Sequence, residues 1–249
     1  MNTMNAISSN ERAQLARLIT RLQNEPEMAS KILASKGISE GVGPAYTIGI
    51  SGAGGVGKST LISRMLPVLR KENLRVVVLA IDPTSEQSQG ALLGDRIRMR
   101  DSYDDDGIFI RSLGTRGAPE ALTVAIPSII QACAPACDLV IVETAGAGQV
   151  DVGIHRYVDT LVTVVAPLGD GITLMKSGQT EHSHIIAINV RQGLPDNDRF
   201  VQQARVILGG DSIEDGWKRK VFAVDAKHNE SIEPFVIEGI LARKGHPSS

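Results

Sequence analysis

One short stretch near residue 50 limits the folds open to this chain more than any other feature. Residues 47–51 are typical of a strand and lead directly into Gly-x-x-x-x-Gly-Lys-Ser, from Gly52 to Ser59. A strand, a glycine-rich turn and a helix in this order are the setting of a P-loop, whose backbone N–H groups and helix N-terminus bind phosphates. The expected helix has apolar residues at helical spacing: Leu61, Ile62, Met65, Leu66 and Leu69. A glycine-rich turn containing Lys-Ser by chance is the competing interpretation, and the flanking strand and helix argue against it.

The P-loop residues have expected roles at a nucleoside triphosphate site. We expect the backbone N–H groups of the loop to surround the phosphates, Lys58 to reach the β- and γ-phosphates, and the hydroxyl of Ser59 to bind Mg²⁺. The nucleotide-binding residues expected in this stretch are Gly52, Gly54, Gly55, Val56, Gly57, Lys58, Ser59 and Thr60.

From residue 46 onward, segments typical of strands alternate with helical segments. This alternation predicts an α/β fold with a doubly wound, mostly parallel sheet that carries helices on both faces. Most of the expected strands are uninterrupted Val, Ile and Leu runs, as in strands buried on both faces. They span residues 46–51, 75–81, 108–111, 139–144, 161–166, 184–189 and 221–224, and a last helix is expected at 230–243.

The first 45 residues differ in pattern from the rest of the chain, and we expect two parts: an N-terminal helical arm at 1–45 and a P-loop domain at 46–249. Ser8 and Glu11 form a capping box, and apolar residues at helical spacing come after it. A second short helix is expected at 27–34, before glycines and a proline that break the pattern. The arm either packs on the main domain or binds a partner, and the sequence does not choose.

Composition argues against several other kinds of protein. The net charge is −2 and long basic runs are absent, so neither nucleic acid nor a membrane surface is an expected partner. No stretch approaches the roughly 18 to 20 apolar residues of a membrane span, and no leader pattern is seen, so we expect a cytoplasmic protein. Cys133 and Cys137 are too few for a disulfide framework and are interpreted as small buried apolar residues.

Three acidic residues lie where they can reach the phosphate site. Asp82 and Glu143 each lie at the end of an expected strand, and Asp95 lies in a polar loop. Mg²⁺ prefers hard oxygen ligands, so we expect Ser59, Asp82, Asp95 and Glu143 to form the metal site. For any one carboxylate, a structural role at a strand end is the competing interpretation. We also expect the N–H of Gly146 to contact the γ-phosphate.

Taken in order, these motifs resemble those of the MeaB/MMAA (ArgK-like) family of P-loop G proteins, which are chaperones of adenosylcobalamin-dependent acyl-CoA mutases. The resemblance is carried by the P-loop, by Ile81-Asp82-Pro83-Thr84, by Gly94-Asp95-Arg96 and by Glu143-Thr144-Ala145-Gly146. It implies the fold of the signal-recognition and MinD-type GTPases, with GTP or GDP and Mg²⁺ bound. It also implies GTP hydrolysis, slow without the partner, with Lys58, Asp82 and Glu143 as catalytic residues and a mutase as the partner.

The same resemblance assigns the base-binding residues, with one departure. The family has Asn-Lys-x-Asp after a strand, whereas here Asn189 is followed by Val190, Arg191 and Gln192. The resemblance implies that Asn189 and Gln192 contact the purine and that the backbone N–H of Ala226 reads the guanine 6-oxo group. A carboxylate accepts from both N1–H and the 2-amino group, whereas an amide offers one oxygen. We therefore expect a preference for guanine that is narrower by roughly ten- to a hundredfold.

Several alternatives stay open. A metallochaperone-type GTPase shares this P-loop class, an ATP-dependent P-loop kinase or ATPase fits the altered base motif, and a nucleotide-dependent interaction protein would have negligible turnover. His182 and His184 are interpreted as structural rather than as metal ligands. The family usually continues beyond the position of Ser249 into a helical arm used for dimerisation, so a homodimer stays an open alternative.

Overall fold

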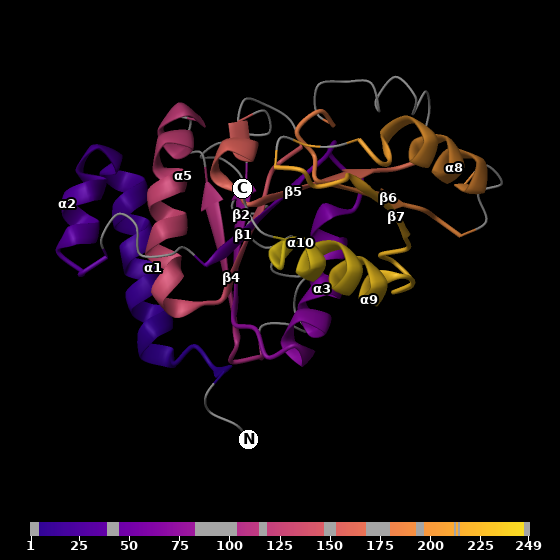
Figure 1. Cartoon of the computed structure of the whole chain (residues 1–249). Coiled ribbons are helices and arrows are strands. Elements are labelled where there is room, and N and C mark those ends of the chain that lie inside the picture. The colour runs from indigo at the N-terminus through magenta and orange to yellow at the C-terminus, as the bar shows by residue number, and fades with distance from the viewer. Residues whose placement is uncertain are drawn as a thin grey trace.

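A parallel sheet lies at the centre of the computed structural model, which describes residues 5–38, 45–82, 104–114, 119–146, 153–167, 180–192, 197–211, 213 and 215–246. Within these residues the sheet has seven strands in the order β3-β2-β4-β1-β5-β6-β7 (Figure 1). The strands are β1 (Tyr46–Ser51), β2 (Val76–Asp82), β3 (Ile108–Gly114), β4 (Leu139–Glu143), β5 (Thr160–Val165), β6 (Ile185–Asn189) and β7 (Lys220–Val224). The strands expected from the sequence are confirmed, with ends shifted by at most three residues.

The strand order brings the end of β1 to the middle of the sheet. Strand β1 pairs with β4 on one side and with β5 on the other, and both pairings are parallel. Because every pairing in the sheet is parallel, the carboxyl ends of all strands lie along one edge, where α/β proteins bind their ligands. The P-loop, which follows β1, therefore lies at the centre of this edge.

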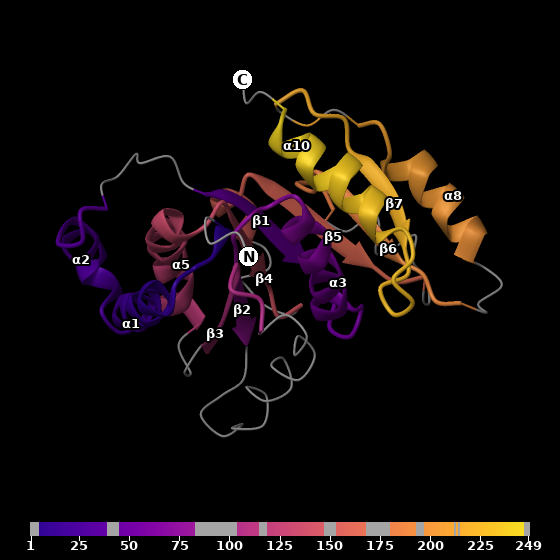
Figure 2. The same cartoon turned by 90° about the horizontal axis from the view of Figure 1, so that it is seen from below.

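Helices cover both faces of the sheet, as Figures 1 and 2 show. Alternate residues of β2 face opposite ways: Val77 and Leu79 join the core beneath one set of helices, and Val76 and Val78 join the core beneath the other. The first face carries α1 (Ser9–Asn24), α2 (Ala29–Ala34), α5 (Pro119–Cys133) and, farther along the sheet, α8 (Asn197–Leu208). The second face carries α3 (Lys58–Lys71) and the C-terminal segments α9 (Ile232–Pro234), η6 (Phe235–Leu241) and α10 (Ala242–Lys244). The doubly wound α/β class is confirmed.

The N-terminal arm packs on the main domain. Ser8 caps α1 through the expected capping box: its hydroxyl accepts from the N–H of Glu11 at 3.3 Å, and its own N–H donates to the Glu11 carboxylate at 2.7 Å. Leu15, Ile19 and Leu22 are buried in the same core as α5, β2 and β4. The described residues also form three short 3₁₀ segments, η2 (Pro26–Met28), η4 (Ala134–Ala136) and η5 (Ile154–Tyr157).

The C-terminal helix begins later than the sequence predicts. Residue 230 was expected inside it, but the helix starts at Ile232 and continues as the π-helical segment η6. Asn229 and Ser231 have φ values of 61° and 58°, and this left-handed backbone interrupts a helix. Glu230 instead closes a turn by pairing with Asp225 in an antiparallel bridge. Among the described residues, no helix combines the length and apolar character needed to span a membrane.

Candidate functional site

The P-loop forms at the end of β1 because three of its glycines take backbone conformations that other residues avoid. Gly52, Gly55 and Gly57 have φ values of 137°, 77° and 97°. A Cβ on Gly52 would lie 2.2 Å from the carbonyl oxygen of Val164, so only glycine allows the loop to pass β5 this closely. Gly57 is the N-cap of α3, which begins at Lys58. The structure thus gathers the predicted phosphate-binding residues in one turn and the first residues of one helix.

The ammonium group of Lys58 is held over this loop. Its Nζ donates to the carbonyl oxygen of Gly52 at 2.8 Å and to that of Ala53 at 3.0 Å. Lys58 is only 6% exposed, and a buried ammonium requires such oxygen partners. The side chain is therefore already aimed at the loop that the sequence assigns to phosphates, and phosphate oxygens are the same kind of acceptor.

Ser59 and Glu143 meet beside the P-loop. The Ser59 hydroxyl donates to Oε1 of Glu143 at 2.6 Å, and the two residues are 8% and 6% exposed. Glu143 is brought there because Ile50 of β1 pairs with Glu143 at the end of β4. A hydroxyl and a carboxylate are hard oxygen donors of the type Mg²⁺ prefers, so this pair fits the predicted metal. Binding of Mg²⁺ by the pair stays a prediction.

Gly146, three residues beyond Glu143, lies directly against the P-loop. Its φ is 86°, and a Cβ there would be 2.6 Å from both the carbonyl oxygen of Gly52 and the Nζ of Lys58. Only glycine permits this approach, so the predicted neighbour of the γ-phosphate lies next to the predicted phosphate-binding lysine. The contact between the Gly146 N–H and phosphate itself stays a prediction.

For the other two predicted metal residues, Asp82 and Asp95, the structure describes at most the backbone. The backbone of Asp82 ends β2, two residues beyond Ala80, which pairs with Glu143 on the neighbouring strand. Asp95 lies outside the described residues. Their roles in binding Mg²⁺ stay predictions.

Asn189 connects three segments that are far apart in the sequence. Its amide Nδ2 donates to the carbonyl oxygen of Val56 in the P-loop at 2.7 Å, and its Oδ1 accepts from the backbone N–H of Ala226 at 3.1 Å. A Cβ on Gly57 would lie 2.3 Å from Nδ2 of Asn189, which shows how closely the loop and this side chain approach. The side chain therefore joins the P-loop to the ends of β6 and β7.

The N–H of Ala226 has a different partner from the one expected. The resemblance implied a contact with the guanine 6-oxo group, whereas the structure shows this N–H donating to Asn189. Ala226 is fully buried, and its carbonyl oxygen accepts from Nε of Arg64 at 3.2 Å. A 6-oxo group would have to share this donor with Asn189, and the base contact stays a prediction.

Gln192 has a partner that no pattern in the sequence indicated. Its Nε2 donates to Oε1 of Glu230 at 2.8 Å, and both residues are exposed at the carboxyl edge of the sheet, beyond β6 and β7. The two residues are 38 positions apart, and no motif joins them. The closest sequence signal was Ala226, four residues before Glu230.

The two histidines that the sequence analysis interpreted as structural, His182 and His184, both contact other parts of the protein. Nδ1 of His184 accepts from the backbone N–H of Leu161 at 3.0 Å, and burial, followed by the charge of Arg243, lowers the pKa of His184 to about 4. The ring of His182 stacks on that of His155 with centroids 4.1 Å apart. The described residues include no group of three or more His, Cys, Asp or Glu placed to hold a metal ion.

The two cysteines are buried and free, as the sequence predicts. The Cys137 thiol donates to the carbonyl oxygen of Cys133 at 3.2 Å, and burial raises the pKa of Cys137 to about 12. Neither is a reactive thiolate near neutral pH.

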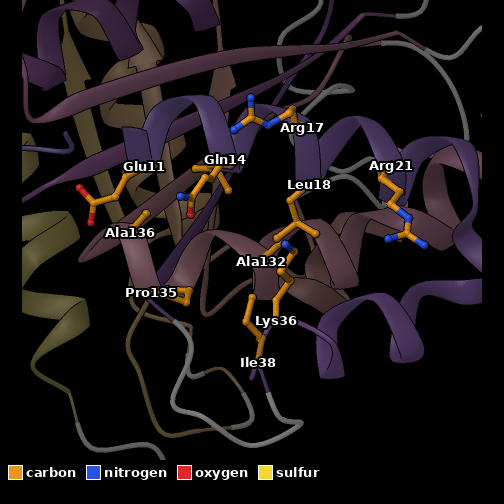
Figure 3. A pocket seen from close by; sticks show the side chains of 11 residues that line it. Glu11, Gln14, Arg17, Leu18, Arg21, Lys36, Ile38, Ala132, Pro135 and Ala136 are labelled. Carbon is orange, nitrogen blue, oxygen red and sulfur yellow. The ribbon is translucent and has the colours of Figure 1, made fainter. Parts of the chain in front are cut away.

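A separate hollow of about 600 Å³ lies on the N-terminal arm (Figure 3). Figure 3 shows Leu18 beside Ala132 and Lys36, with Arg17 and Arg21 on the same helix as Leu18. Part of its lining, Ala132, Pro135 and Ala136, lies shortly before β4, whereas the P-loop follows β1 at the opposite edge of the sheet. This hollow is therefore distinct from the candidate nucleotide site.

A parallel sheet with a P-loop at its central strand, a buried lysine over that loop and a serine–carboxylate pair beside it define a P-loop nucleoside triphosphatase. Residues 15–243 match the model of the family described as methylmalonyl Co-A mutase-associated GTPase MeaB. The chain belongs to this family, as the resemblance had indicated.

Named relatives agree with this assignment. A Pyrococcus abyssi protein named as a GTPase is 41% identical over 90% of this chain and 69% of its own length. A second, from Pyrococcus horikoshii, is 42% identical over 74% of this chain and 58% of its own length. The fused isobutyryl-CoA mutase of Cupriavidus metallidurans is 39% identical over 80% of this chain, which corresponds to 19% of that mutase.

Solved structures show the same fold. HypB from Helicobacter pylori, in complex with nickel, has a TM-score of 0.53 at 13% identity and covers 95% of this chain and 98% of its own. The hydrogenase maturation factor HypB from Archaeoglobus fulgidus has a TM-score of 0.53 at 17% identity, with coverages of 92% and 99%. At these identities the likeness concerns the fold alone.

Proposed function

We propose that the protein is a Mg²⁺-dependent GTPase that acts as a chaperone of an adenosylcobalamin-dependent acyl-CoA mutase. The observation that carries the hydrolytic part is the grouping of Lys58, Ser59 and Glu143 around one P-loop, held by hydrogen bonds of 2.6–3.0 Å. Membership of the MeaB family supports guanine nucleotide as the substrate.

Phosphoryl transfer of this kind depends on positioning and on charge stabilisation. The loop N–H groups and Lys58 would hold the β- and γ-phosphates while a water attacks the γ-phosphorus in line. The bond to the bridging oxygen then breaks, and GDP and phosphate are released. Bound Mg²⁺ would neutralise developing charge on the phosphates, and Ser59 and Glu143 are the described residues whose oxygens would hold it. Gly146 lies next to Lys58, so loss of the γ-phosphate would be felt at the start of the segment after β4.

The mutase partner is inferred from relatives rather than from a surface. Three relatives named fused isobutyryl-CoA mutase, from Cupriavidus, Nocardia and Paraburkholderia, contain a segment similar to this chain within a much longer protein. Covalent fusion keeps a regulator at high local concentration beside its target. We infer that this chain serves a mutase of the same chemical class, an acyl-CoA mutase.

The test compares hydrolysis of GTP and ATP, each with Mg²⁺, with excess EDTA, and with purified isobutyryl-CoA mutase. We expect GTP to be hydrolysed faster than ATP, turnover to stop in EDTA, and the rate to change when the mutase is added. Equal or faster ATP hydrolysis would favour a P-loop kinase or ATPase instead. An unchanged rate, together with no binding to the mutase in calorimetry, would contradict the chaperone role.

A further inference from the structure

The pairing of Gln192 with Glu230 constrains which atom of the Gln192 amide faces outward. A carboxylate only accepts hydrogen bonds, so the NH₂ end of the amide must face Glu230, in agreement with the 2.8 Å contact from Nε2 to Oε1. The amide oxygen of Gln192 is then turned away from Glu230. An otherwise freely rotating amide is thereby held in one of its two orientations.

The backbone that carries Glu230 is itself held in place. Asp225 and Glu230 exchange N–H···O bonds of 3.1 and 3.0 Å, and these bonds close the turn after β7. Inside the turn, the buried Asp225 carboxylate accepts from the backbone N–H of His228 at 3.0 Å and contacts its ring Nδ1 at 2.8 Å. The turn is also tied to α3 through Arg64 and to β6 through Asn189.

Gln192 is carried by the neighbouring strand end. The N–H of Val190 donates to the carbonyl oxygen of Val224 at 2.8 Å, which fixes the ends of β6 and β7 relative to each other. Asn189, three residues before Gln192, is bonded to the P-loop. Gln192 and Glu230 are therefore exposed side chains on two fixed backbones, at the edge of the sheet where the P-loop lies.

The orientation of this amide matters because guanine and adenine differ at the edge of the purine that carries N1 and C2. Guanine presents donors there, N1–H and the 2-amino group, whereas adenine presents N1 as an acceptor. An outward amide oxygen accepts from guanine and repels the lone pair of adenine N1. An outward NH₂ would do the reverse.

We propose that Glu230 is a positioning residue for base selection, which holds the Gln192 amide with its oxygen toward the base and so favours guanine over adenine. The inference rests on the proposed function, because it takes the nucleotide to be bound at the P-loop with its base near Gln192. In this proposal, Gln192 oriented by Glu230 accepts the hydrogen bond from guanine that the Asp carboxylate of the Asn-Lys-x-Asp motif accepts in the family.

Glu230→Gln is the decisive substitution, because it preserves size while removing the orientation. A glutamine at 230 can offer either its oxygen or its NH₂ to Gln192, so both amide orientations become possible. The matched control is Glu233→Gln, an equally conservative change at an exposed position three residues away. Calorimetric titrations with GDP and with ADP, both with Mg²⁺, give the ratio of the two affinities for each protein.

We expect Glu230→Gln to lower the GDP-to-ADP affinity ratio by about tenfold, because the reversed amide can then donate to adenine N1, an effect of the size of one neutral hydrogen bond. Glu233→Gln should leave the ratio unchanged. In a Gln192→Ala background, Glu230→Gln should have no further effect on the ratio, because the amide through which Glu230 acts is gone.

Other results would overturn the inference. An unchanged ratio in Glu230→Gln would show that the amide is not oriented by Glu230. An equal change in the Gln192→Ala background would show that Glu230 acts on the base without Gln192. If the unmodified protein binds neither nucleotide, the proposed function fails with it, whereas selective GDP binding without any effect of Glu230→Gln defeats this inference alone.

Discussion

The phosphate end and the base end of the candidate nucleotide site are built in different ways. The phosphate end comes mainly from one continuous stretch, Gly52–Ser59, to which Glu143 is added from the adjacent strand. Its charged groups are buried and strongly bonded. The base end is assembled from the ends of β6 and β7, and two of its side chains, Gln192 and Glu230, are exposed.

This difference indicates how the two ends divide the work. Buried charge-assisted contacts are stronger than exposed ones, so the phosphate end should supply most of the affinity for any nucleoside triphosphate. Under the proposed function, the base end would contribute less binding energy but would distinguish one purine from another. Asn189 is the side chain that joins the two ends, through Val56 on one side and Ala226 on the other.

The largest effect is expected from Lys58→Ala, which removes the cation of the phosphate end. We expect binding of non-hydrolysable GTP and ATP analogues to weaken by about a hundredfold or more, because charge-assisted bonds to two phosphates are lost. The two affinities should fall by the same factor, since no base contact changes. Calorimetry measures both. Lys71→Ala, at an exposed position at the end of α3, is the matched control. A loss of affinity for only one of the two nucleotides would contradict the division into a phosphate end and a base end.

A smaller effect, on turnover rather than on binding, is expected from Glu143→Gln. The change keeps the shape of the acceptor for Ser59 but removes the charge that we assign to Mg²⁺ binding. We expect the GTPase rate to fall by roughly ten- to a hundredfold and to need more Mg²⁺, while GDP affinity changes by less than about threefold. Steady-state rates over a magnesium series test this. A wild-type rate would mean that Glu143 is not at the metal, and exposed Glu72→Gln serves as the control.

The smallest effect is expected at His184, which precedes β6 at the end opposite Asn189 and should act on stability alone. Its folded pKa of about 4 lies below the ordinary value of 6.5, so the unfolded chain takes up the proton first as the pH falls. This contribution to the free energy of unfolding is complete above about pH 6.5 and is lost progressively toward pH 4. We expect His184→Gln to reduce this loss and to leave the GDP-to-ADP ratio unchanged.

Denaturant titrations at several pH values between 4 and 7 measure that loss. The charged groups that act on His184 are Arg243, Arg219, Asp215 and Asp159, and they stay in place in the variant. Exposed His182→Gln is the matched control and should keep the pH dependence of the unmodified protein. If the free energy of unfolding depends on pH in the same way in His184→Gln as in the control, the buried neutral state of His184 does not contribute to the stability.

Much of the fold and of the phosphate end could be predicted from the sequence. Buried strands appear as apolar runs, so β1 was expected with the bounds that the structure shows, and the other strands within three residues. The P-loop could be predicted because its turns need glycine at Gly52, Gly55 and Gly57, and because Lys58 and Ser59 lie within the same few residues. The shape of the P-loop depends on local backbone geometry, and the residues that set this geometry are contiguous in the sequence.

The base end was decided by the tertiary structure. The sequence predicted a helix that begins at residue 230, but left-handed backbone at Asn229 and Ser231 holds Glu230 in a turn instead. Gln192 and Glu230 meet across 38 positions only because β6 and β7 pair in parallel and end at the same edge of the sheet. Contacts of this kind depend on strand order and register, which no local pattern of residues records. The sequence by itself therefore determined the P-loop stretch, and the packing of the sheet decided which side chains meet at the ends of β6 and β7.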